Sequence, residues 1–391
     1  MKILTVDIGT GTQDIFLYNS ELDLENGFKL VVPSPTMMVY RRIQEATRRG
    51  DPILLTGVTM GGGPSHWAAR DHAAAGFPVY ATEDAARTFD DDLSKVREEG
   101  IEIIGRDEIS TLPGSPAELE LRDFDFPAIQ RSLGQFGVDL TDLDAAAAAV
   151  FDHGAAPPEI SDRQFRFDYL AERLPLGEPP GAERISTLSQ LAFLRGEIPK
   201  EMTRLKAVEI SASDLDAPLV IMDTAPAAVL GALLDPHLQA RERVLAANIG
   251  NFHTLAFRFN QGAVEGVFEH HTGLLEPSEI EGLLRKFASG ELTHQDVFGD
   301  HGHGAMLNPE SDPYLFGVDD FDLAVTGPRR SLIRETSLRS FFPAPFGDMM
   351  LVGCFGLLAA AADLLPEIRE TVLASLRGGG GRGTPPWEIS G

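Results

Sequence analysis

The most constraining feature of this 391-residue sequence is a strand–turn–strand pattern that occurs twice. Residues 3–19 contain two β-prone runs separated by a glycine- and threonine-rich turn at 8–12. The same order recurs over residues 243–259, around a Gly-Asn turn at 250–251. A hairpin repeated near the middle of the chain predicts two related halves. The length of the chain also favours two domains, because single hydrophobic cores rarely grow to this size.

Strands and helices alternate through the rest of the chain, which predicts an α/β fold. An alanine-rich run ends abruptly at Asp152, His153 and Gly154. Alanine favours a helix, but an apolar run that stops at such a turn fits a central strand, and we favour the strand. The other expected elements are strands at 53–60, 219–222, 263–269 and 323–326, and helices at 37–49, 187–196, 277–288 and 347–362.

The net charge excludes two classes of partner. A formal charge of −26 repels nucleic acid and anionic membrane surfaces, so neither is an expected partner. The longest uncharged apolar run, 349–362, is too short to span a bilayer, and no signal-peptide pattern precedes the first strand. We therefore expect a cytoplasmic protein.

The turn of the first hairpin has the chemistry of a phosphate loop. Gly9 and Gly11 allow backbone N–H groups to point at a phosphate, and the hydroxyls of Thr10 and Thr12 add donors. Asp7, at the end of the first strand, is placed to hold the water shell of a Mg²⁺ ion.

Five segments in this order resemble the actin-like ATPase superfamily, which includes acetate and sugar kinases, chaperone ATPases and actins. The resemblance implies two ribonuclease H-like βββαβαβα domains around a nucleotide cleft, with ATP and Mg²⁺ as cofactors and hydrolysis or γ-phosphate transfer as the reaction. The segments are 7–12, 221–232, 246–254, 324–330 and 347–362. The resemblance implies a first domain at 1–240, with an irregular insertion at about 85–140, and a second domain at 241–345. Closing helices follow at 346–377, and a flexible tail follows at 378–391.

The resemblance also assigns candidate residues to the second half of the cleft. Gly250, Asn251 and Thr254 correspond to the second phosphate loop, and Gly327 with Arg329 corresponds to the turn that contacts adenosine. The family usually has Asp where this chain has Asn248, so Asn248 implies weaker Mg²⁺ binding and slower hydrolysis.

Asp152 is a candidate general base. Sugar kinases of the superfamily place a catalytic aspartate after such a central strand, and a carboxylate there could accept a proton from a water or a hydroxyl. The alternative is an aspartate that caps a turn or a helix.

Histidines suggest a transition-metal site as a further alternative. Members of the superfamily that transfer carbamoyl groups bind a metal through two histidines one helical turn apart, and this chain has no such pair. The candidates here are His153, His270, His271, His301 and His303.

The chain also resembles a family labelled "pyruvate formate-lyase activating enzyme-like", partly through Asp-His-Gly followed by Arg163 to Arg166. A glycyl-radical activator needs three cysteines for its iron–sulfur cluster, and this chain has only Cys354. We therefore expect no iron–sulfur cluster. Three functions remain: an ATPase or kinase acting on an unidentified small-molecule acceptor or protein partner, a nucleotide sensor without turnover, and a metal-dependent group-transfer enzyme.

Overall fold

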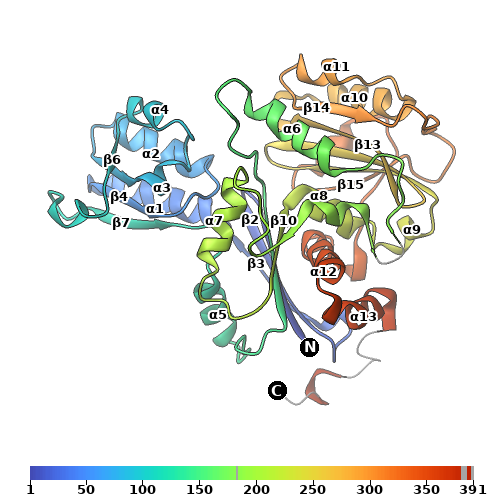
Figure 1. The fold of residues 1–391 in the computed structure, drawn as a ribbon, viewed down its shortest axis with the longest axis horizontal. Helices are drawn as coiled ribbons and strands as arrows, with labels where there is room; N and C mark the ends of the chain where they lie inside the picture. Colours follow the sequence, from blue (N-terminus) through green and yellow to red (C-terminus); the bar gives the residue numbers. More distant parts are fainter. Residues whose placement is uncertain (182–183, 380–384, 389–391) are drawn as a thin grey trace.

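The protein forms two lobes, each built on a six-stranded mixed sheet, with a smaller third sheet beside the first lobe (Figure 1). The structure is a computed structural model that describes residues 1–181, 184–379 and 385–388. Within these ranges, no helix combines the length and the apolar character needed to cross a membrane.

The first sheet has the strand order β3-β2-β1-β8-β10-β9. β1 pairs antiparallel with β2, and β2 with β3, whereas β8 lies parallel to both β1 and β10. The strands are β1 (Lys2–Ile8), β2 (Thr12–Asn19), β3 (Phe28–Pro33), β8 (Ala145–Val150), β9 (Ala192–Leu194) and β10 (Leu219–Asp223).

The alanine-rich run is the central strand β8, as the sequence analysis predicted. Its side chains alternate between two hydrophobic cores, with Ala145, Ala147 and Ala149 in one core. Ala146 and Ala148 belong to the other core. Tertiary burial on both faces therefore overrides the helical propensity of alanine.

The second sheet repeats the pattern of the first, in the order β14-β13-β12-β11-β15-β16. β11, β12 and β13 form an antiparallel meander, and β15 lies parallel to β11. The strands are β11 (Arg243–Ile249), β12 (His253–Asn260), β13 (Ala263–His271), β14 (Gly304–Leu307), β15 (Leu323–Thr326) and β16 (Ser340–Phe341). Two sheets that each combine a three-stranded meander with parallel strands confirm the predicted actin-like, ribonuclease H-like fold.

The third sheet lies in an insertion between β3 and β8, on the left of Figure 1. Its strand pairs are all parallel, and part of it falls within 85–140, the stretch expected to be irregular. Its strands are β4 (Ile53–Gly57), β5 (Val79–Thr82), β6 (Ile101–Ile104) and β7 (Ala117–Leu121). β7 reads Ala-Glu-Leu-Glu-Leu and exposes both glutamates, which is why its pattern is too polar to predict a buried strand.

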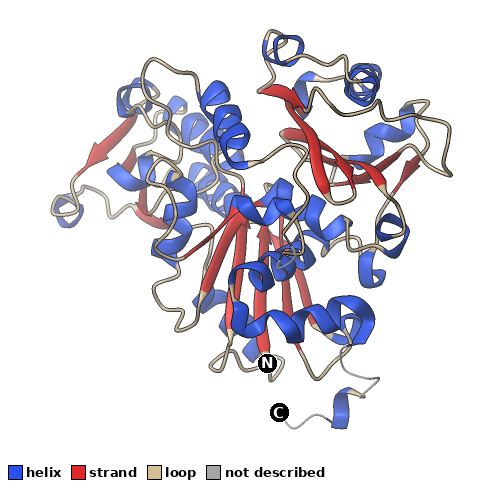
Figure 2. Ribbon diagram, turned by 45° about the vertical axis from the view of Figure 1, so that its right-hand side comes forward, coloured by secondary structure: helices blue, strands red, loops and turns tan. Residues whose placement is uncertain are grey.

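The helices cover both faces of the first sheet and the outer side of the second (Figure 2). The longer ones are α1 (Pro35–Arg49), α2 (Pro64–Ala74), α5 (Phe126–Gly134), α6 (Asp162–Arg173), α7 (Thr203–Ser211), α8 (Thr224–Ala232), α10 (Pro277–Ser289), α12 (Val352–Leu364) and α13 (Pro366–Ala374). The short ones are α3 (Glu83–Ala86), α4 (Leu93–Glu98), α9 (Pro236–Gln239) and α11 (His294–Phe298).

Two predicted helices differ from the structure. The helix expected at 187–196 is wrong: a 3₁₀ turn at Thr187–Leu191 leads into the edge strand β9, which pairs with β10. The helix expected to start at 347 starts at Val352, after a 3₁₀ turn at Pro345–Gly347. The tail expected to be flexible from 378 onward lies partly outside the described residues.

Helices α8 and α12 pack with their backbones almost in contact. A Cβ atom added to Gly356 would lie 1.8 Å from the carbonyl oxygen of Ala227, and one added to Gly231 would lie 1.7 Å from that of Val352. Both helices are buried over nearly their whole length. This contact holds α12 against the first sheet, beside β1.

We predict that Gly356→Ala lowers the free energy of unfolding by about 1–3 kcal/mol or more, because the new methyl group overlaps the backbone of α8. Urea denaturation measures this change. Gly282→Ala, at an exposed position of α10 with room for the methyl group, is the control. It should raise the free energy of unfolding by about 0.5–1 kcal/mol. Equal effects of the two substitutions would contradict the tight α8–α12 contact.

Candidate functional site

A cavity of about 720 Å³ lies between the two lobes and the insertion. The turns of both repeated hairpins line it, together with the loops after β4, β8 and β15 and the start of α12. The carboxyl ends of parallel strands therefore meet at this cavity, which is where open α/β sheets usually bind their ligands.

The two hairpin turns have the same backbone geometry. In the first turn the N–H of Gly9 donates to the carbonyl of Thr12 over 2.9 Å, and in the second the N–H of Gly250 donates to the carbonyl of His253 over 2.8 Å. A Cβ atom on Gly11 would lie 3.5 Å from the side-chain nitrogen of Asn251. The two turns thus face each other closely across the cavity, as a pair of phosphate loops would.

Two carboxylates lie beside the first turn. Asp7 on β1 is the cross-strand partner of Asp14 on β2, and both line the cavity. The hydroxyl of Thr224, at the start of α8, donates to Asp7 over 2.6 Å. Burial, with a smaller contribution from Asp223, raises the pKa of Asp7 to about 6. Burial and the neighbouring Asp7 raise the pKa of Asp14 to about 7. A pair of desolvated carboxylates is a site that a divalent cation would stabilise.

The other predicted nucleotide-contact residues are divided between the cavity and its surroundings. Thr10, Thr12, Asn248 and Gly327 line the cavity. Thr254 is fully buried, and its hydroxyl hydrogen-bonds that of Thr272 over 2.9 Å.

In the turn after β15, Arg330 lines the cavity rather than the predicted Arg329. Its guanidinium donates to the carbonyl of Gly327 over 2.9 Å. Pro328 and Met349 complete a partly apolar wall suited to a base.

Asp152 reaches the cavity, but its carboxylate is held by backbone donors. One oxygen accepts from the N–H of Gly154 at 2.8 Å, and the other accepts from the N–H groups of Arg204 and Leu205 at 3.0 and 2.9 Å. Arg204 and Leu205 lie in the first turn of α7, so Asp152 acts as a helix cap. Burial raises its pKa. These contacts are those of the structural alternative considered for Asp152.

A buried ion-pair network joins the two lobes. Arg166 of α6 lies 2.7 Å from Asp223, at the end of β10, and 3.1 Å from Glu269 of β13. It also donates to the carbonyl of Asp152 over 3.2 Å. Burial alone would raise the pKa of Glu269, but Arg166 and the neighbouring histidines His303 and His253 hold it well below its usual range.

Four histidine rings cluster beside this network. Ring centroids lie 5.1 Å apart for His153 and His253, 5.0 Å for His253 and His303, and 4.7 Å for His271 and His303. Burial and the other histidines lower the pKa of His153 well below its usual value. Burial likewise lowers the pKa of His303 to about 3 and that of His271 to about 4. These three rings are therefore neutral at neutral pH.

The cluster differs in membership from the predicted histidine set. Of the five predicted histidines, the cluster contains His153, His271 and His303. The other two lie outside it: His301 is exposed, and the Nε2 of His270 lies 3.5 Å from Asp300. The sequence analysis missed His253, which is the cross-strand partner of His271. Aligning the two predicted strands in antiparallel register would have revealed this pair.

The insertion supplies a third wall of the cavity that the sequence analysis also missed. Gly61, Gly62 and Gly63 run along it before α2. The Arg204 guanidinium binds Asp123 over 2.7 Å, and the Asp123 carboxylate accepts from the N–H of Gly61 at 3.2 Å. This contact fixes the insertion against α7 at the edge of the cavity.

A family model described as "Putative pyruvate format-lyase activating enzyme (DUF1786)" matches residues 60–332. The chain belongs to this family. No curated protein matches it. The label fits the chain poorly, since its single cysteine, Cys354, is buried in α12 with its sulfur 3.1 Å from the carbonyl oxygen of Asp14.

Three solved structures are similar over nearly the full chain. Ethanolamine utilization protein EutJ from Carboxydothermus hydrogenoformans is 12% identical, with 92% of this chain and 89% of that chain covered and a TM-score of 0.33. The activator of the 2-hydroxyisocaproyl-CoA dehydratase from Clostridium difficile, with bound ADPNP, is 10% identical, with 95% and 97% covered and a TM-score of 0.34. The inorganic polyphosphate/ATP-glucomannokinase from Arthrobacter sp. strain KM is 13% identical, with 93% and 99% covered and a TM-score of 0.33.

We predict that Asp14 lowers the free energy of unfolding of the metal-free protein as pH rises from about 4 towards 7, against the opposite contribution of the buried histidines, whose pKa values are lowered. The pKa of Asp14 is raised from 3.8 to about 7, so in this window the folded state holds more protons than the unfolded state. Asp14→Asn should remove this contribution, so that the variant gains stability relative to the wild type as pH rises, as measured by urea denaturation in the presence of a chelator. Asp142→Asn, at an exposed ion pair with Lys2, is the control and should leave the slope unchanged. Parallel wild-type and Asp14→Asn curves would contradict the burial of a charged carboxylate here.

Proposed function

We propose that this protein binds ATP with Mg²⁺ in the cavity between its lobes, and hydrolyses it or transfers its γ-phosphate. The observation that carries the proposal is the pair of matching hairpin turns, which face each other across the cavity with Gly11 close to Asn251. Turns of this kind present backbone N–H groups to an anion from two sides. The volume of about 720 Å³ is within the usual range for a small-molecule site.

In this proposal Asp7 and Asp14 hold the water shell of the metal ion beside the first turn. Both carboxylates are desolvated, so they gain more from a nearby cation than exposed carboxylates would. A bound Mg²⁺ would neutralise charge on the β- and γ-phosphates. Thr10 and Thr12 donate hydroxyls to the phosphates, and Pro328 packs against the base.

The insertion is the proposed place for the acceptor or partner. Its wall, which includes Gly61 and His66, is the part of the cavity that does not belong to either repeated lobe. The acceptor is either a small molecule or a protein partner.

A nucleotide sensor without turnover is the second candidate. Two observations favour it: Asn248 stands where the superfamily has an aspartate, and the Asp152 carboxylate is already occupied by backbone donors. The first feature removes a charge that would help to order a metal ion, and the second leaves the carboxylate less free to accept a proton.

We predict that Asp7→Ala weakens Mg²⁺-dependent ATP binding or turnover by about 10–100-fold, because a partner of the metal's water shell is lost. Calorimetric titration with ATP, ADP and GTP, with and without Mg²⁺, measures binding, and phosphate release measures turnover. Asp142→Ala, on the surface of the same lobe, is the control and should behave as the wild type. An Asp7→Ala protein that stays folded and keeps wild-type affinity and rate would show that the first hairpin has only a structural role.

We predict that Asn248→Asp increases both the Mg²⁺ dependence of ATP binding and the rate of hydrolysis. The substitution keeps the shape of the side chain but adds a negative charge at the cavity wall, which attracts Mg²⁺ and repels metal-free triphosphate. The same titrations and phosphate-release assay measure both effects. If brisk turnover of the wild type is unchanged in the variant, the kinase is favoured. If both forms bind ATP without turnover, the protein is a sensor.

A further inference from the structure

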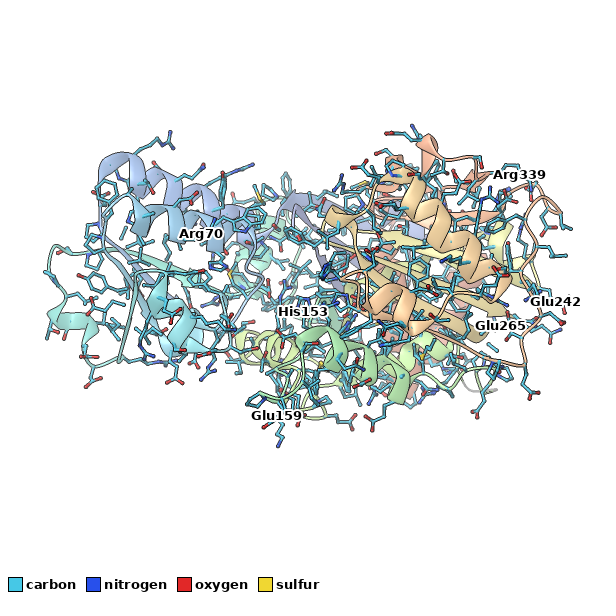
Figure 3. The ribbon with its side chains drawn as sticks, turned by 90° about the horizontal axis from the view of Figure 1, so that it is seen from above. Arg70, His153, Glu159, Glu242, Glu265 and Arg339 are labelled. Atoms are coloured by element: carbon cyan, nitrogen blue, oxygen red, sulfur yellow. The ribbon has the colours of Figure 1, made fainter. Side chains whose placement is uncertain are left out.

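We propose that His153, His253 and His303 form a binding site for a divalent transition metal such as Zn²⁺, separate from the Mg²⁺ site of the nucleotide. These three side chains each offer one ring nitrogen, and the three nitrogens lie within 4.8 Å of one another. Three different segments bring them together: the loop after β8, the start of β12 and the loop before β14. Figure 3 places His153 at the middle of the molecule, between the insertion and the second lobe.

The spacing of the three rings suits a tetrahedral metal. Imidazole nitrogens about 2.0–2.1 Å from Zn²⁺ lie roughly 3.3 Å apart in tetrahedral geometry, so each ring needs to move by less than about 1 Å. Small side-chain rotations of this size require no change in the backbone. Imidazole is also a ligand that suits Zn²⁺, Co²⁺ and similar ions, whereas Mg²⁺ prefers oxygen.

His303 is difficult to explain without a ligand. It is fully buried, and neither of its ring nitrogens has a hydrogen-bond partner among the described residues. Buried polar atoms normally find a partner, since they lose their hydrogen bonds to water on folding. A metal ion between the rings would satisfy the free nitrogen of His303 that faces its neighbours.

The surroundings of His253 resemble those of a metal ligand. Its Nδ1 lies 3.2 Å from a carboxylate oxygen of Glu269, whose other oxygen lies 3.1 Å from Arg166. Histidines that bind metals usually pair their second nitrogen with a carboxylate or carbonyl, which fixes the ring and its tautomer. Glu269 would hold His253 with Nε2 available to the metal.

The proposed site has an open side. His153 and His253 both line the nucleotide cavity, so a metal held by the three rings faces that cavity. A site with three protein ligands leaves one tetrahedral position for water or for a substrate oxygen, which is the arrangement of catalytic rather than structural zinc. The open position points to a bound ligand that coordinates through oxygen beside the phosphate loops.

The test uses the full chain without an affinity tag, stripped of metal and kept free of nucleotide. Zn²⁺ titration by calorimetry should show one tight site per chain, and Co²⁺ should give the intense visible absorption of a tetrahedral complex. Glu269→Gln should reduce metal affinity by about 10–100-fold, because it weakens the orientation of His253. His303→Asn should abolish tight binding, and thermal unfolding shows whether each variant is folded.

His301→Asn is the matched control. His301 lies two residues from His303 but is exposed, and asparagine accepts its left-handed backbone conformation at φ 63°. It should bind metal as the wild type does. The proposal is overturned if the wild type binds neither Zn²⁺ nor Co²⁺ tightly, or if His303→Asn and His301→Asn lower the affinity equally. It is also overturned if the Co²⁺ spectrum is that of an octahedral oxygen site.

Discussion

The ion pairs of Arg166 are the interaction on which the arrangement of the site depends. The guanidinium is almost completely buried and binds a carboxylate from each lobe, Asp223 on one side and Glu269 on the other. Removing one partner of such a network leaves an uncompensated buried charge, which typically costs about 3–5 kcal/mol. The two sheets are thus held at one relative position close to the cavity, and Glu269 is in turn held beside His253.

The electrostatic character of the cavity comes from two groups of side chains. The desolvated carboxylates Asp7 and Asp14 line it, as do His253 and His153, whose pKa is lowered. Hard cations such as Mg²⁺ prefer the carboxylate oxygens, whereas borderline-soft cations such as Zn²⁺ bind well to the imidazole nitrogens. One cavity therefore contains two chemically distinct sets of candidate cation ligands.

The close packing of α8 against α12 gives this cavity its floor. Thr224 at the start of α8 donates to Asp7, and a Cβ atom on Gly353 of α12 would lie within 2 Å of the same carboxylate. Small residues on both helices let the backbones approach Asp7 and leave less room for water around it. The raised pKa of Asp7 follows from this packing rather than from any charged neighbour alone.

The sequence alone determined the repeated hairpins, the buried central strand and the two glycine-rich turns, because local periodicity and turn chemistry specify these features. It also identified Asp7 as a candidate ligand from its place at the end of the first strand, and His153 and His303 from their residue type. Only the tertiary structure showed what holds the Asp152 carboxylate, since its backbone donors come from α7, about fifty residues away. It also decided which histidines meet: His253 and His271 become neighbours through strand register, and His303 joins them through the β13–β14 connection. Contacts between segments distant in sequence depend on packing, which residue patterns within one segment do not encode.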